Sequence, residues 1–451
     1  MDKKYITIIA VVAIVVIAAA AAVFLLNSGN GGGNEGGGGT GPEYENLNTI
    51  SLSIYGNANE DYTIDQKDID LINQMISSGT ALSEHPYADA DGDGKVTSAD
   101  VDVVKKFIAG EKTKIRLIDQ YAYYSGVDHL AAIDYPLENV VAINPEMIQM
   151  TFYFDGDEKV AGYVANPTSN PVNFYKILNN GFSRSLGTTA RNLTQVEWQA
   201  LTALSSELYE KGEAIGAVLA YNDEALKEYK DDIQNAEIPI IYLRCTDPVY
   251  SIDAALLLGM LMGPKYAVKA QEFANDCRKA VADITTAVQN LPDDDRVHFI
   301  ALCMWRYISQ HDSQYTKIGI SAGGIDEANL EGNASVPLAD VEAITKFNGK
   351  IDYILNCRTS DCVVTDPVVL WGDSRLDILK KSTEYENMFF LNLSIPAPCR
   401  VMYAASMFYP DLITTDQANN YFQLMEIPEH PLAFRLRHVH FRNADRKIDK
   451  P

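Results

Sequence analysis

Residues 89–100 carry side chains whose types and spacing could hold a calcium ion. Carboxylates stand at the first, third and fifth positions of this segment, and the glycine at the sixth allows a sharp turn. The seventh residue can offer its backbone carbonyl, the ninth can act through water, and the acidic twelfth completes the shell of six to eight oxygens that calcium prefers. A solvated acidic turn is the alternative, but the helical pattern that follows favours a calcium loop. The predicted ligands are Asp89, Asp91, Asp93, Lys95, Thr97 and Asp100.

A weaker copy of this pattern begins at Asn57, 32 residues before Asp89. Its sixth position holds Tyr62, where the later loop has Gly94. Because glycine suits the sharp turn at that position, we expect weaker binding or an altered geometry in the first loop. The predicted ligands of this loop are Asn57, Asn59, Asp61, Thr63, Asp65 and Asp68.

An amphipathic segment follows each loop, with apolar residues at spacings that place them on one face of a helix. A glycine, Gly79 or Gly110, stands where each helix would end. Residues 56–110 are therefore predicted to form two loop–helix units that pack against each other. The apolar residues are Ile69, Ile72 and Ile76 after the first loop and Val101, Val104 and Ile108 after the second.

Residues 51–111 resemble a type I dockerin, a module that binds a cohesin domain on another protein. The resemblance rests on the duplicated loop with Asp at its twelfth position. It implies two structural calcium ions, the first loop binding more weakly, that support folding and do not signal. It also implies recognition residues at positions 10 and 11 of each loop. These pairs are Gln66–Lys67 and Ser98–Ala99, and their difference argues against symmetrical binding in two orientations.

The chain begins with a candidate membrane anchor. Ile6–Leu26 is apolar apart from Thr7, and its 21 residues would span about 30 Å as a helix. Lysines precede the run and no basic residue follows before Lys67, so the N-terminus should be cytoplasmic and the bulk of the chain extracellular. We favour an uncleaved single-pass anchor over residues 1–27; a signal peptide cleaved near Ala20–Ala22 is the alternative. Residues 28–50, rich in Gly, form a flexible linker.

The formal net charge of −24 makes duplex nucleic acid an unsuitable partner, because phosphate binding requires a basic surface. The sequence has six cysteines, too few for a disulfide scaffold in a chain of this length. Buried thiols are expected for most of them, and Cys357 could pair with Cys362. We identify no nucleophile elbow, His-Glu-x-x-His motif, phosphate loop or paired carboxylate outside the calcium loops, so we do not expect an enzyme.

After Tyr135, short apolar runs alternate with helical patterns, which is typical of a parallel α/β sheet. A long helical segment, about Pro264–Leu291, divides the runs into two groups. We predict an α/β fold with two Rossmann-like lobes, residues 112–262 and 293–431, joined by a hinge helix at 263–292 and followed by a basic tail, 432–451. The runs are 140–143, 214–220, 238–243, 297–304, 318–320, 351–355 and 389–393.

Residues 113–430 resemble the iron-siderophore and vitamin B12 class of ABC-transporter solute-binding proteins. The resemblance implies a metal chelate (siderophore, haem or corrinoid) held between two lobes that close little, and an ABC permease as a possible partner. It is carried by segments in the expected order: Asn139–Met147, Lys159–Tyr163, Leu186–Thr188, Asn192–Leu193, Ile238–Leu243, Ala254–Gly263, Ser321–Ile325 and Ile351–Leu355.

The chain departs from this class where an acidic residue on each lobe would contact the permease. The corresponding places hold Thr194 and Ala339, with acidic Glu197, Asp340 and Glu342 nearby. Capture of a ligand is therefore better supported than delivery to a permease. A surface assembly or adhesion protein that reuses the fold without transport is the alternative function.

Residues at the carboxyl ends of the strands would line the cleft in such a fold. Arginine can grip carboxylate, phosphate or catecholate oxygens, and aromatic side chains can stack on rings. Each candidate has an ordinary alternative as a surface cation or a core aromatic. The candidates are Glu146, Arg184, Thr188, Tyr242, Arg244, Trp305, Arg306, Gly323, Arg358 and Trp371.

Overall fold

The computed structural model describes the greater part of the chain beyond the predicted linker. The apolar run at residues 6–26 lies outside the described residues, and no helix within them is long and apolar enough to cross a membrane. All described residues belong to one unit, Asn46–Pro451. The described ranges are 52–164, 184–187, 193–248, 250–303, 307–332, 334–338, 341–358, 374–392, 397–418 and 440–442.

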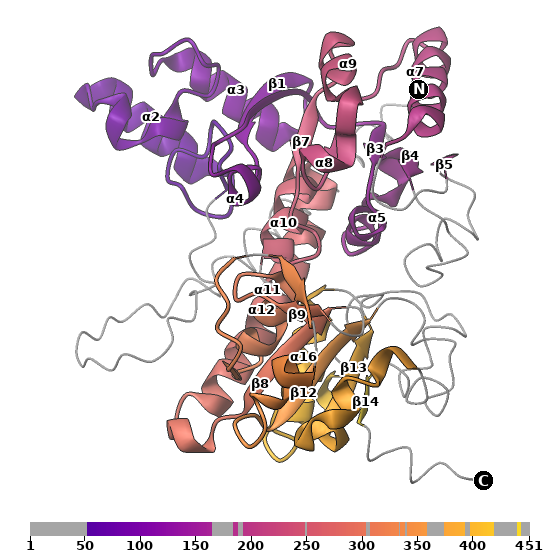
Figure 1. Cartoon of the computed structure of the whole chain (residues 1–451). Helices are drawn as coiled ribbons and strands as arrows, with labels where there is room; N and C mark the ends of the chain where they lie inside the picture. The colour runs from indigo at the N-terminus through magenta and orange to yellow at the C-terminus, as the bar shows by residue number, and fades with distance from the viewer. Residues whose placement is uncertain are drawn as a thin grey trace, which may run out of the picture. The chain divides into compact units, whose positions relative to one another are not determined.

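Two loop–helix units open the described structure (Figure 1). Helix α2 spans Gln66–Ser78 and α3 spans Ser98–Ala109, and both begin with a capping box in which two backbone N–H groups are satisfied by side chains. Both end at the predicted glycines, which adopt the left-handed conformation with φ of 70° at Gly79 and 69° at Gly110. Short 3-10 turns at Leu82–Glu84 and Pro86–Ala88 connect the two units.

The apolar faces of α2 and α3 differ from the prediction at one position each. Ile76 and Ile108 are 41% and 39% exposed. Met75 and Phe107, one residue earlier, are buried instead. The buried residues are therefore spaced three apart along each helix, which is one of the ridge patterns through which helices pack. The buried sets are Ile69, Ile72 and Met75 in α2 and Val101, Val104 and Phe107 in α3.

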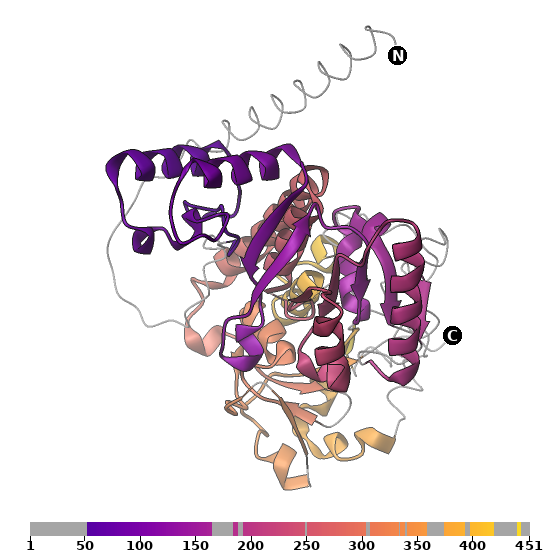
Figure 2. The ribbon, with the colours of Figure 1, turned by 90° about the horizontal axis from the view of Figure 1, so that it is seen from above.

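A hairpin that the sequence analysis assigned to the first lobe joins the loop–helix module to that lobe (Figure 2). Strands β1, Thr113–Ile118, and β2, Leu130–Tyr135, pair antiparallel, with the short helix α4, Ala122–Ser125, between them. A single bridge links Ile54 of the module to Leu117 of β1. The hairpin is thus continuous with the module on one side and leads into the first lobe on the other.

The first lobe is a five-stranded parallel sheet in the order β5-β4-β3-β6-β7. Every residue of β3, β6 and β7 is buried, as expected for strands covered on both faces. The strands are β3 Val140–Ala142, β4 Val160–Val164, β5 Arg184–Gly187, β6 Ala217–Ala220 and β7 Ile240–Tyr242. The helices are α5 Pro145–Phe152, α7 Gln195–Glu210, α8 Asp223–Leu226 and α9 Lys230–Asn235.

Two consecutive helices form the connection between the lobes (Figure 1). Helix α10, Tyr250–Met262, is apolar on nearly every side and almost wholly buried. Helix α11, Pro264–Val288, corresponds to the predicted hinge helix and is amphipathic. Gly263, with φ of 115°, separates the two helices. Pro264 is the first residue of α11; it lacks a backbone N–H, which costs nothing there because the N–H groups of a helix's first turn have no partner within the helix.

The second lobe contains a mixed sheet in the order β11-β9-β8-β12-β13-β14, with β10 beside β8. The run at 318–320, predicted as a strand, lies in helix α12, Gln314–Ser321, because Ser313 caps a helix there. The basic tail contributes β14 against β13. The strands are β8 His298–Cys303, β9 Tyr307–Ser309, β10 Ile325–Asp326, β11 Ser335–Pro337, β12 Tyr353–Arg358, β13 Met388–Asn392 and β14 His440–Arg442, and the other α-helices are α13 Val341–Thr345 and α16 Ala397–Phe408.

The largest apolar core is shared by the module, the hairpin, α10, α11 and α16. Each lobe adds a smaller cluster of its own on the other face of its sheet. Five cysteines in the described ranges are buried within these layers, at positions 245, 277, 303, 357 and 399. Cys362 lies outside the described residues, so its pairing with Cys357 stays a prediction.

Candidate functional site

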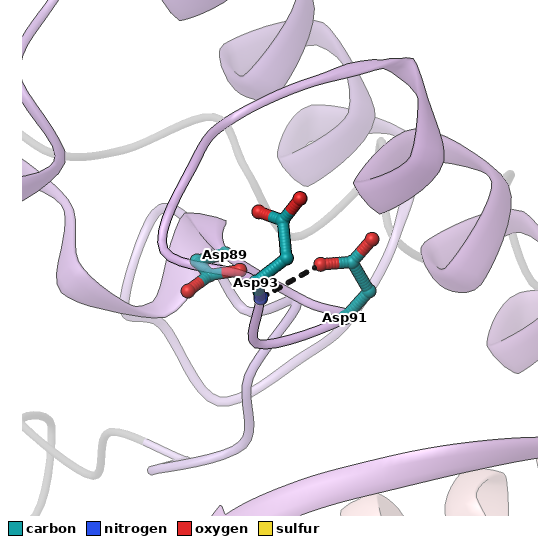
Figure 3. Close-up of side chains that lie close together, drawn as sticks. All are labelled: Asp89, Asp91 and Asp93. Atoms are coloured by element: carbon teal, nitrogen blue, oxygen red, sulfur yellow. Dashed lines mark hydrogen bonds between the residues drawn. The ribbon is translucent and has the colours of Figure 1, made fainter.

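The second loop gathers the three predicted carboxylates (Figure 3). Ligand oxygens of Asp89, Asp91 and Asp93 all lie within 4.8 Å of one another. Backbone N–H groups of Gly92 and Gly94 donate to Asp89 at 2.8 and 3.0 Å, and that of Asp93 donates to Asp91 at 3.0 Å. Gly94 adopts φ of +85°, which glycine tolerates without strain. The loop is therefore shaped around its carboxylates and brings them together.

Asp100 closes this loop from the first turn of α3. Its carboxylate is buried and accepts hydrogen bonds from the N–H groups of Asp91 (3.1 Å) and Thr97 (2.7 Å). Burial raises the pKa of Asp100, and the nearby Asp91 and Asp89 add to the rise. A bound cation would offset both effects, because it neutralises the carboxylates that repel each other.

The first loop repeats most of this network. Asp68 accepts from the N–H groups of Asn59 (3.2 Å) and Asp65 (2.8 Å), as Asp100 does in the second loop. The Asp61 carboxylate accepts from the backbone N–H of Thr63 at 2.7 Å. At the same positions of the second loop, the Asp93 carboxylate accepts from the backbone N–H of Lys95 at 2.8 Å. Burial raises the pKa of Asp68 to about 7. Both loops thus place a buried carboxylate at the twelfth position.

The first position of the first loop carries an oxygen that lacks a partner. Asn57 is fully buried, and its amide nitrogen donates to the carbonyls of Leu52 (2.7 Å) and Asp61 (2.6 Å). Its Oδ1 has no hydrogen-bond partner within the part of the chain that the structure describes. An orphaned buried oxygen is costly unless something binds it. The hard oxygen set of both loops therefore fits calcium.

The two loops differ at the sixth position, where Tyr62 replaces glycine. Tyr62 does not adopt a positive φ; in this loop Glu60 does, at 58°. No hydrogen bond joins Tyr62 to Asn57, whereas Gly94 donates to Asp89 in the second loop. The altered geometry expected from the sequence is thus present.

A second candidate site is a cavity of about 180 Å³ between the lobes. The first lobe contributes Tyr221, which follows β6, and Arg244, which follows β7. The second lobe contributes the start of α12 and residues at the beginning of β11. The second-lobe residues are Asp312, Ser313, Gln314, Tyr315, Ala334 and Ser335. The lining is thus mostly polar and comes from both lobes.

Arg244 is held firmly at this cavity. Its Nη2 donates to Asp247 at 3.0 Å, and its backbone N–H donates to Gln120 at 2.6 Å. The guanidinium lies 4.5 Å from the ring centre of Tyr250 and 4.8 Å from that of Tyr123. These contacts fix the orientation of the cation before a ligand arrives, which reduces the entropy lost on binding.

Buried polar groups continue from the cavity toward the hinge. Arg400 of α16 is 2% exposed and donates to the carbonyl of Thr246 at 3.2 Å. Burial lowers the pKa of Arg400, and Glu146 in the first turn of α5 opposes that shift. Buried oxygens of Asn144 and Gln314 have no hydrogen-bond partner in the described ranges. This region therefore offers charges and acceptors to a polar molecule.

The structure places only some of the residues predicted to line the ligand cleft near one another. Arg244 lines the cavity, and Glu146 lies near Arg400. Tyr242 does not line it, because its buried ring packs 4.5 Å from the ring centre of Tyr121 and its hydroxyl bonds to Asp223. The side chains of Arg184 and Arg358 and all of Thr188, Trp305, Arg306 and Trp371 lie outside the described residues.

Gly323 also lies away from the cavity. Its φ is +90°, a side chain there would meet Val288 at the end of α11, and its carbonyl accepts from the hydroxyl of Tyr409 at 2.8 Å. Gly319–Gly323 spells G-x-S-x-G, the pattern of a nucleophile elbow, which the sequence analysis missed. Ser321 ends helix α12, however, and does not stand on a strand-to-helix turn. This serine therefore lacks the setting of a hydrolase nucleophile.

The sequence analysis missed most of the cavity residues. Tyr221 directly follows a predicted strand, so the strand-end rule could have found it. The residues of α12 gave no such signal, because their apolar run was read as a strand. Ser335 belongs to a short antiparallel strand that the alternating pattern did not indicate.

The described chain thus combines a duplicated acidic loop–helix module with two α/β lobes that are joined by a long helix. Residues 55–109 match the dockerin type I domain. The type I dockerin predicted from the sequence is thereby confirmed. A search of curated proteins finds no match to the chain.

Solved structures similar to the chain are solute-binding proteins. The molybdate periplasmic binding protein MolA of Haemophilus influenzae is 13% identical, with a TM-score of 0.50 over 70% of this chain and 98% of that one. Two further structures are similar. A periplasmic solute binding protein from Veillonella parvula is 12% identical, with a TM-score of 0.47 over 72% of this chain and 97% of that one. Ceue of Helicobacter pylori, with Ni(II) bound, is 12% identical, with a TM-score of 0.48 over 71% of this chain and 98% of that one. The likeness to MolA establishes the fold of the lobes.

Proposed function

We propose that this chain is a membrane-tethered extracellular solute-binding protein of an ABC-type uptake system, attached through its dockerin to a cohesin-bearing protein. The observation that carries the proposal is the cavity between the lobes, lined by Tyr221 and Arg244 from one lobe and by the start of α12 from the other. A ligand that touches both lobes stabilises their closed arrangement, which is how a two-lobed binder captures its solute.

The ligand presents several oxygen atoms or other hydrogen-bonding groups to this cavity. Arg244 supplies a fixed guanidinium, and the ammonium of Lys317 lies 4.8 Å from the ring centre of Tyr250, next to it. A cavity of about 180 Å³ holds a small oxyanion or the metal-binding part of a larger chelate. A siderophore, haem or corrinoid would extend from it toward the neighbouring loops.

The dockerin would hold two structural calcium ions. The second loop supplies Asp89, Asp91, Asp93 and Asp100, together with the carbonyl of Lys95. The first loop supplies the buried Asn57 Oδ1 and Asp68, together with the side chains of Asn59, Asp61 and Asp65. Calcium would neutralise these carboxylates and so favour the folded module.

Fewer acidic side chains are available to contact a permease than the sequence alone implies. Glu197 is buried and serves as the capping residue at the start of α7, where it binds Thr194. The Glu197 carboxylate therefore caps its own helix and is not exposed to a permease. Glu342 at the start of α13 is exposed, so the second lobe retains an acidic residue close to the expected place.

A thermal-shift screen of the full chain tests the proposal. Haem, ferric siderophores, corrinoids and oxyanions are the probes, and we expect at least one to raise the unfolding temperature. Ala334→Trp, an exposed residue at the cavity, should abolish that shift by filling the space. Tyr307→Trp, an exposed residue of the adjoining strand β9 that does not line the cavity, should preserve it. No shift with any probe would favour the surface-assembly role instead.

A further inference from the structure

The end of the second loop–helix unit abuts the start of the hinge helix. A side chain at Gly110, the glycine that ends α3, would lie 3.0 Å from Cδ of Pro264, the first residue of α11. Beside this contact, the rings of Phe107 and Tyr135 stack at 4.4 Å, and the Tyr135 hydroxyl donates to the carbonyl of Phe107 at 2.9 Å. The dockerin is thus packed against the binding domain and does not hang from a free linker.

The first calcium loop contacts the same helix further along. The guanidinium of Arg278 in α11 lies 4.7 Å from the ring centre of Tyr62. Pro264 and Arg278 are fourteen residues apart, so the dockerin follows α11 for about 21 Å. Nε and Nη2 of Arg278 are buried without a hydrogen-bond partner among the described residues, and burial lowers the pKa of Arg278 against the opposing effect of Asp253 in α10. The Tyr62 ring is therefore a close neighbour of this partly buried cation.

The second calcium loop is contacted from the hairpin. The guanidinium of Arg116 in β1 occupies the space that a side chain at Gly92 would need. The same guanidinium lies 4.4 Å from the ring centre of Tyr55, and the Arg116 carbonyl accepts from the Tyr55 N–H at 2.9 Å. Each calcium loop thus carries an arginine from outside the two loop–helix units.

We propose that calcium binding to the dockerin is energetically coupled to the hinge helix of the solute-binding domain through the contact of Tyr62 with Arg278. This inference rests on the proposed calcium sites. Tyr62 stands between Asp61 and Thr63, two of the predicted ligand positions, so an ion that fixes those residues also fixes the ring under the guanidinium. The hinge helix gains a rigid partner only when the first loop is ordered.

The physical basis is linkage between two sites. If the ordered loop holds Arg278 better than the calcium-free loop does, calcium stabilises the hinge, and an intact hinge raises the affinity of the loop for calcium by the same factor. A partly desolvated cation–ring contact of this kind is typically worth a factor on the order of fivefold in an equilibrium. The position of the lobes, and hence ligand capture, would respond to calcium.

Hydrogen–deuterium exchange of the full chain, solubilised in mild detergent, tests the coupling in the peptide that covers residues 264–288. We expect calcium to slow exchange in this peptide by about fivefold. Tyr62→Ala should remove the calcium-dependent part of the protection, and Tyr62→Phe, which keeps the ring, should retain it. Equal exchange with and without calcium in the parent protein, or equal loss in both variants, overturns the proposal.

Calcium titration calorimetry of the same proteins supplies the reciprocal measurement. Arg278→Met should weaken calcium binding, while Lys279→Met, which removes one charge from an exposed position of the same helix, should leave it unchanged. Equal changes in both variants would indicate a general charge effect and refute the specific contact. Absence of any calcium binding by the parent protein would refute the calcium sites themselves, whereas binding without protection of α11 refutes only the coupling.

Discussion

Arg400 provides a test of how the two lobes are held together. Its buried guanidinium extends from α16 in the second lobe to the carbonyl of Thr246 in the first, at 3.2 Å. Glu146, in the first lobe, is the neighbour that most strongly opposes the effect of burial on the pKa of Arg400. Arg400→Met keeps much of the side-chain volume but leaves Glu146 without this counter-charge. Breaking a buried pair in this way typically lowers the free energy of unfolding by about 3–5 kcal/mol.

Urea denaturation of the full chain, followed by circular dichroism, measures this loss. Glu146→Gln alone should also destabilise, because it leaves the buried cation uncompensated. The double variant Glu146→Gln/Arg400→Met removes both charges, so its loss should be clearly smaller than the sum of the two single losses. If the loss in the double variant equals the sum of the two single losses to within about 0.5 kcal/mol, the two residues act independently and the predicted pairing of their charges is refuted.

Three further predictions concern the dockerin. Phe107→Ala should lower the free energy of unfolding by about 3–5 kcal/mol because the ring is buried, whereas Ile108→Ala, at the exposed neighbouring position, should change it by less than about 0.5 kcal/mol; a urea titration that found equal losses would contradict the packing. Asp100→Asn should weaken calcium binding in calorimetry, and Asp102→Asn, on the exposed face of α3, should not. Calcium affinity of the first loop should fall by up to about tenfold for each pH unit below 7, because the pKa of Asp68 is raised to about 7 and its carboxyl must lose a proton to bind the ion. Equal affinity at pH 6 and pH 8 would count against this role for Asp68.

The gathering of acidic side chains in the second loop could be predicted from the sequence because their spacing is local. Asp89, Asp91 and Asp93 lie in five consecutive residues, so their spacing alone brings their oxygens together. The helix ends were equally predictable, since Gly79 and Gly110 act through their own backbone conformation. The buried face of each helix was harder to predict, because the packing of the helices in the folded module buries Met75 and leaves Ile76 exposed.

The cavity between the lobes could not be predicted in the same way. Arg244 was found because it follows a strand, but Ser313 and Ser335, which line the same cavity, come from distant parts of the chain that meet only in the folded protein. The apolar run 318–320 is compatible with a strand and with a buried helix. In the structure it is helical, and the side chain of Ser313 caps the start of that helix. Tertiary contact, rather than local pattern, fixed these residues.

Tyr62 illustrates how a departure from a motif can carry information. Within the loop, tyrosine is a poorer choice than glycine, because a residue with a side chain adopts the positive φ seen at Gly94, which donates to Asp89, only at a steric cost. The sequence alone therefore indicates a weakened calcium site. In the folded chain the same ring lies 4.7 Å from the guanidinium of Arg278, whose Nε and Nη2 have no hydrogen-bond partner among the described residues. A glycine at this position would restore the regular loop and remove that contact, so the residue serves the attachment of the dockerin to the hinge helix at some cost to the loop.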